Sequence, residues 1–75
     1  MALSLLSAGE ARRLLLMQML TIRILLREDG AVLYQMLDEG RTARCFLLQE
    51  LLVFVGLRTD QVFQAVRASM HIVAL

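Results

Sequence analysis

The stretch RLLLMQMLTIRILLREDGAVLYQML, residues 13–37, contains the clearest periodic pattern in this chain. Its apolar residues include a seam with intervals of four, three and four, which is typical of one face of a helix. The seam consists of Leu15, Met19, Ile22 and Leu26. Ser7 and Glu10 stand upstream at capping-box spacing, so the sequence predicts a helix from this cap to about Glu28. Residues 31–39 predict a second, shorter helix.

The segment CFLLQELLVFVGL, residues 45–57, is the most apolar part of the chain, with Gln49 and Glu50 as its strongly polar side chains. We expect a third helix from an N-cap at Thr42 to about Val55. Its polar residues point in different directions around a helix, so no solvent-facing side of normal width remains. The sequence therefore predicts that another chain covers this helix.

A fourth helix is expected to begin at Thr59, and the final residues IVAL, 72–75, fit either a helix end or a short strand. The chain is therefore predicted to be one all-α domain of four helices over residues 1–75. Hydrophobic residues make up 59% of the sequence, against a usual ~45–50%, and a small domain buries only ~60–65% of its unfolded surface. We therefore expect an intertwined, obligate oligomer, with a dimer favoured because two-fold assemblies are commonest. The expected oligomer interface comprises Leu15, Met19, Ile22, Leu26, Phe46, Leu48, Leu52 and Phe54.

The sequence contains no group of residues with the spacing of a catalytic, cofactor-binding or metal site, so none of these is predicted. His71 is the only histidine and Cys45 the only cysteine. A nucleophile–base pair between them is a weaker interpretation than a surface or interface histidine and a core cysteine. The net charge of +1 is low for an autonomous nucleic-acid-binding domain. Direct nucleic-acid binding is therefore expected to be weak or indirect, with phosphate contacts from Arg12, Arg23 and Arg27 as the remaining option.

Two stretches resemble the flagellar master-regulator subunit FlhD: residues 13–37 and the segment LRTDQVFQAVRASMHIVAL, residues 57–75. In the first stretch the matching residues are Arg23, Leu25, Leu26, Asp29, Ala31 and Tyr34. In the second stretch, Gln61 matches a glutamine in the pattern of that family. The resemblance implies an entwined all-helical homodimer that joins a second, DNA-contacting protein to activate transcription.

The favoured function is a non-enzymatic protein-interaction subunit in the cytoplasm, with a copy of itself and a second regulatory protein as the expected partners. One alternative is a small helical enzyme with its active site at the subunit interface, for which Arg44, Gln49 and Glu50 are the available polar side chains. The other is peripheral membrane attachment, but the chain lacks the dense Lys/Arg face that such helices carry. No transmembrane span is expected, because arginines interrupt the long apolar runs.

Overall fold

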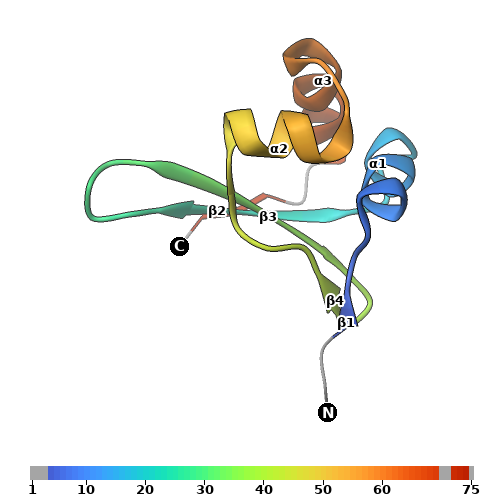
Figure 1. The fold of residues 1–75 in the computed structure, drawn as a ribbon, viewed down its shortest axis with the longest axis horizontal. Coiled ribbons are helices and arrows are strands. Elements are labelled where there is room, and N and C mark those ends of the chain that lie inside the picture. Colours follow the sequence, from blue (N-terminus) through green and yellow to red (C-terminus); the bar gives the residue numbers. More distant parts are fainter. Residues whose placement is uncertain (1–3, 70–71, 75) are drawn as a thin grey trace.

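The chain folds into two layers in the computed structural model, which describes residues 4–69 and 72–74. Within these residues, three helices lie on one face of a mixed β-sheet (Figure 1). The elements are β1 (Ser4–Leu5), α1 (Ala8–Leu16), β2 (Thr21–Leu26), β3 (Val32–Asp38), β4 (Arg41–Thr42), β5 (Phe46–Leu47), α2 (Leu48–Val55), α3 (Thr59–Ser69) and β6 (Ile72–Ala74). The prediction of an all-α fold of four helices is therefore wrong, because segments expected to be helical form the central strands.

The β2–β3 hairpin is the centre of the sheet. β2 pairs antiparallel with β3 over the full length of β2, from Thr21 opposite Leu37 to Leu26 opposite Val32. β6 pairs with β2 in parallel on one side, while β5 and β4 pair with successive parts of β3 on the other. β1 adds to β4 in parallel, so the sheet order is β1–β4–β3–β2–β6 with β5 beside β3. The final segment, which fitted either a helix or a strand, is strand β6 over Ile72–Ala74.

Helix α1 ends at Leu16, well before the predicted end at about Glu28. The backbone amide of Met19 donates to the carbonyl oxygen of Leu14 at 2.9 Å, which is the bond that defines a Schellman motif at a helix C-terminus. Gln18 adopts a left-handed conformation with φ 59°, at the position where glycine is usual. Because the residue there is not glycine, the sequence does not mark this helix end.

Replacing Gln18 by glycine is expected to stabilise the fold by about 0.5–1 kcal/mol, because glycine adopts the left-handed conformation without a Cβ clash. The Gln18 side chain is exposed, so its removal costs little packing. Urea or thermal denaturation of Gln18→Gly beside Gln18→Ala checks this, since alanine keeps the Cβ and is expected to give no gain. Equal stability of the two variants would contradict the proposed cause.

The β2–β3 hairpin turns between Arg27 and Ala31. The Gly30 amide donates to the carbonyl oxygen of Arg27 at 2.9 Å, and Gly30 has φ 86°, which glycine adopts readily. Asp29 Oδ1 accepts a hydrogen bond from the Ala31 amide at 3.0 Å, a side-chain bond that stabilises turns. Asp29 and Gly30 lie between the two helices predicted from the sequence, but in the structure they close a hairpin. Asp-Gly is a preferred sequence for such turns.

Helix α2 begins at Leu48 rather than after Thr42, because the chain first pairs with β3 as strand β5. Gly56 ends α2 in a left-handed conformation with φ 66°, as its position predicts. The predicted fourth helix is confirmed as α3. The predicted cap of the first helix is also confirmed, because the Ser7 hydroxyl accepts from the Glu10 amide at 3.2 Å.

The hydrophobic core lies between the sheet and the helices. Ile22 and Met36, which are opposite one another on β2 and β3, are 1% and 0% exposed. They share one core cluster with Leu15 of α1, Leu51 of α2 and Val62 of α3. Each such buried side chain contributes about 1.5–3 kcal/mol by leaving water. All three helices are therefore held on the same face of the central hairpin.

Candidate interaction surface

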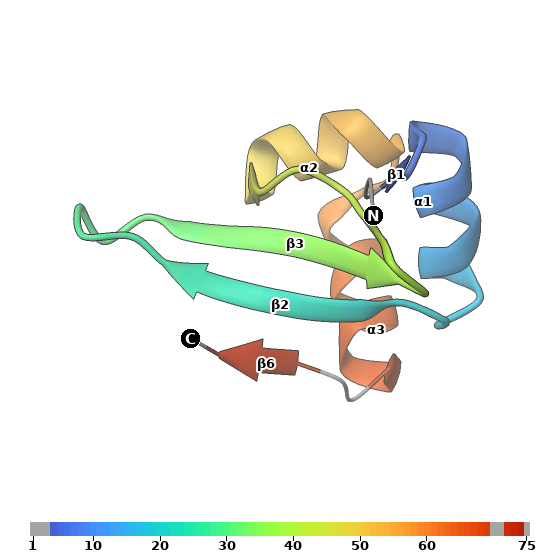
Figure 2. The same ribbon diagram turned by 90° about the horizontal axis from the view of Figure 1, so that it is seen from below.

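The sheet has one face that no helix of the described chain covers (Figure 2). Side chains alternate between the two faces of a strand, so the neighbours of the buried residues Ile22 and Met36 face away from the helices. We call the surface that they form the bare face. It comprises Leu5, Thr21, Arg23, Leu25, Leu33, Gln35, Leu37, Thr42 and Leu47.

The bare face is organised in rows that cross the strands. One apolar row occupies registered positions on β2, β3 and β5; it consists of Leu25, Leu33 and Leu47. A mixed row lies nearer the other end of the hairpin; it consists of Thr21, Leu37, Thr42 and Leu5. The uncovered face of an antiparallel sheet usually carries polar side chains, so the leucines in both rows are the unusual feature of this surface.

A polar pair separates the two rows. Arg23 and Gln35 are opposite one another, and Arg23 Nη1 donates to Gln35 Oε1 at 3.4 Å. Among the described residues, this is the one hydrogen bond that the Arg23 side chain forms. The Nε atom of Arg23 is buried and has no acceptor there. A guanidinium has five N–H donors, so the terminal nitrogens of Arg23 carry donors that have no acceptor among the described residues.

The structure distributes the eight predicted interface residues between the core and several surfaces. Leu15, Ile22 and Phe46 are buried in the core of the chain itself, Met19 and Leu26 are exposed, and Leu48, Leu52 and Phe54 are partly buried. None of the eight belongs to the bare face. Sequence reasoning missed that face because it assumed helical spacing; the period-two spacing of Leu33, Gln35 and Leu37 was the available signal.

The three arginines predicted to contact phosphates lie on separate elements. Arg12 of α1 donates through Nη1 to the carbonyl oxygen of Gly56 at 3.3 Å, at the C-terminus of α2. Arg23 lies on the bare face, and Arg27 forms an ion pair with Asp29 at the hairpin tip. The hydrogen bond from Arg27 lowers the pKa of Asp29 to about 2. Only the single long helix predicted from the sequence would place these three arginines on one face, and the structure does not bring their side chains together.

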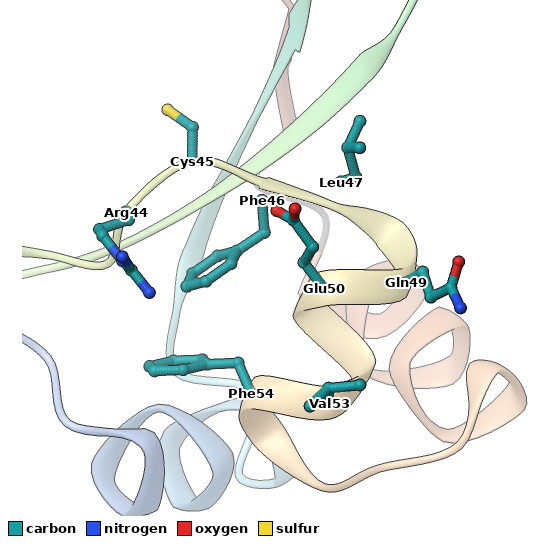
Figure 3. A pocket seen from close by; sticks show the side chains of 8 residues that line it. All are labelled: Arg44, Cys45, Phe46, Leu47, Gln49, Glu50, Val53 and Phe54. Atoms are coloured by element: carbon teal, nitrogen blue, oxygen red, sulfur yellow. The ribbon is translucent and has the colours of Figure 1, made fainter.

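An open groove of about 690 Å³ lies beside α2 (Figure 3). Phe46 and Phe54 stack in it with ring centroids 4.7 Å apart. The guanidinium of Arg44 lies 5.6 Å from the Phe46 centroid, within the range of a cation–π interaction. Gln49 and Glu50 line the same groove. The three polar residues considered for an interfacial enzyme site are therefore gathered in one place, where all three are exposed.

Cys45 is exposed and free beside this groove, so the expectation of a core cysteine is wrong. Figure 3 shows its thiol pointing away from the phenylalanine pair. His71, considered as its base, lies outside the described residues. Among the residues that the structure describes, no group of three or more His, Cys, Asp or Glu side chains is placed to hold a metal ion. The groove thus presents an aromatic surface with a cation at its rim.

An ion-pair network ties α1 to the sheet. Arg41 of β4 pairs with Glu10 of α1 and with Asp38 of β3. The hydrogen bond from Arg41 holds the pKa of the Glu10 carboxyl below its usual value. Arg41 and Asp38 are registered on the helix side of the sheet, so these charges orient α1, and none of the nine residues that define the bare face is a carboxylate.

Comparisons with protein families, curated proteins and solved structures give no significant match for the chain. The resemblance to FlhD therefore stays a prediction, and the helical fold that it implies is not the fold of this chain. Of the helices in the described part of the chain, none combines the length and the apolar character needed to cross a bilayer.

Proposed function

We propose that the chain is a non-enzymatic protein-interaction module that docks a partner protein on the bare face. The observation that carries the proposal is the set of leucines on a sheet face left uncovered by the helices of the chain. A partner that covers them removes apolar surface from water, which contributes about 25 cal/mol per Å². The face offers leucine, threonine, glutamine and arginine side chains, which suit packing and hydrogen bonding rather than acid–base or nucleophilic chemistry.

A protein surface fits the bare face better than a nucleic acid or a lipid headgroup layer. Of the nine residues that define this face, one is positively charged, namely Arg23. Nucleic-acid affinity grows with the number of phosphates that cations neutralise, and surface attachment to membranes uses dense Lys/Arg clusters. The role in transcription control implied by the FlhD resemblance would add a DNA-contacting protein to the assembly, and it stays a prediction.

Replacing Leu33 by glutamine is expected to release the chain from its assembly without unfolding it. Leu33 lies in the middle of the apolar row and is already partly exposed, so glutamine can be solvated in the free chain. A partner would instead have to bury its amide, at a cost of about 1–3 kcal/mol for each unpaired group. Sedimentation velocity with circular dichroism measures both properties: the wild type should sediment above its 8.5 kDa, and Leu33→Gln as a folded monomer.

The matched control is Val53→Gln on α2. Val53 is 80% exposed and lies off the bare face, so this variant loses an apolar surface residue without touching the proposed docking site. It should sediment as the wild type does. A wild-type chain that remains a monomer and copurifies with no stoichiometric partner would overturn the proposal.

A further inference from the structure

We infer that the partner on the bare face is a second copy of this chain, packed sheet against sheet about a two-fold axis that runs along the strands between β2 and β3. This inference rests on the proposed function and names its partner. A two-fold contact requires a surface that is complementary to itself. The registered rows of the bare face meet that condition for this orientation of the axis.

Rotation about this axis brings β2 of each copy over β3 of the other. Because Leu25 and Leu33 are registered on one sheet, each Leu25 then lies over Leu33 of the other copy. By the same operation each Arg23 lies over Gln35 of the other copy. An amide oxygen has two lone pairs, so each Gln35 can accept from both arginines. The axis therefore supplies Arg23 with a second acceptor and buries the apolar row against itself.

The shape of the sheet favours the same axis. β1 and β4 bend away from the helices, so they form a raised edge on one side of the bare face, whereas β6 is the edge on the other side (Figure 1). The proposed axis places the raised edge of each copy beside β6 of its partner. A two-fold axis perpendicular to the strands would instead set the two raised edges against each other and stack Arg23 on Arg23 of the other copy.

The size and charge of the face also suit a second copy. β2 has six residues, and with ~3.4 Å per residue and ~4.8 Å between strands the sheet spans about 20 Å by 20 Å. A standard interface buries ~800 Å² on each partner, which is more than the flat area of this sheet. The pleated surface of the bare face and the raised edges must therefore both contribute to the contact. The nine described residues of the bare face include one cation and no carboxylate, and the proposed axis offsets the two arginines.

Spin labels on single cysteines measure the orientation of the axis in the full chain. In a Cys45→Ser background, Glu28→Cys places a label at the exposed hairpin tip. The proposed axis brings the two tips to the same end of the dimer, about 10–15 Å apart between Cα atoms for sheets ~10 Å apart that cross at ~30°. The perpendicular axis puts them at opposite ends, about 35 Å apart, because each tip lies about 17 Å from the Arg23 row.

The control label is Gln64→Cys on the exposed side of α3. The helices lie outside both sheets in the proposed dimer, so these labels should be about 30 Å apart or more. Adding Leu33→Gln to the Glu28→Cys chain should raise the dimer dissociation constant about tenfold or more and abolish the short distance.

Three results would overturn the inference. One is a long distance between the Glu28 labels in a stable dimer, which refutes the axis. Another is a dimer that Leu33→Gln does not weaken, which refutes the bare face as the contact. The third is a pure chain that stays monomeric at high micromolar concentration, although the wild type sediments in a larger assembly when isolated with its partner. In that last case the partner is a different protein, and the proposed function stands without the second copy.

Discussion

Replacing Leu51 by aspartate is expected to unfold the chain. Leu51 is 1% exposed on α2 and belongs to the core cluster that all three helices share with the hairpin. The variant loses about 1.5–3 kcal/mol of apolar burial and leaves an unpaired carboxylate in the core, which costs several kcal/mol more. A domain of 75 residues has a total stability of about 4–11 kcal/mol at ~0.05–0.15 kcal/mol per residue. The expected loss is therefore comparable to the whole stability of the fold.

Val53→Asp is the matched control, because it introduces the same carboxylate into the same helix. Val53 is 80% exposed, so the charge remains in water. Its position in the second half of α2 costs at most about 1 kcal/mol through the helix dipole. Circular dichroism and the chemical-shift dispersion of amide protons should show an unfolded Leu51→Asp chain and a folded Val53→Asp chain. A Leu51→Asp variant that melts cooperatively at the wild-type temperature would show that this side of α2 is not in the core.

These two positions also show how far the apolar segment of residues 45–57 can be interpreted from sequence. Gly56 predicts where the helix ends, which the structure confirms. The composition predicts burial, which holds for part of the segment only, because Leu47 and Val53 are exposed. The identity of the covering surface was not predictable, since composition does not distinguish the sheet of the same chain from another chain. The structure buries Leu51 and Val55 in the core of the chain itself and leaves Val53 in water.

The central hairpin was missed because two periodicities fit the same residues. The helical seam and the alternation of Leu20, Ile22 and Ile24 are both present, since most positions in this stretch are apolar. Two local signals favoured strands: the β-branched residues at positions 21, 22 and 24, and the Asp-Gly turn at positions 29–30. The end of α1 carried no such signal, because Gln18 rather than glycine adopts the left-handed conformation there.

What covers the bare face was not predictable from the sequence, for a different reason. A strand pattern with apolar residues on both faces predicts that both faces are covered, but it does not say by what. In this chain the helices pack on the face of Ile22 and Met36, and no helix of the described residues lies on the other face (Figure 2). Only the three-dimensional arrangement separates the leucines that form the core from the leucines available to a partner.

Met36→Ala is expected to lower the free energy of unfolding by about 2–5 kcal/mol, whereas Leu37→Ala should lower it by only about 1 kcal/mol. Met36 is 0% exposed and opposite Ile22, so its truncation leaves a cavity between the sheet and the helices. Leu37 is partly exposed on the bare face, so its truncation removes less buried surface. On a helix over residues 31–39, both residues would lie in one buried stripe and cost similar amounts. Urea denaturation of dilute, monomeric protein measures the difference, and equal losses would contradict the strand. At higher concentration the two variants should differ in the opposite sense in dimer affinity. Leu37→Ala should weaken the proposed dimer because it removes contact surface, whereas Met36→Ala should not.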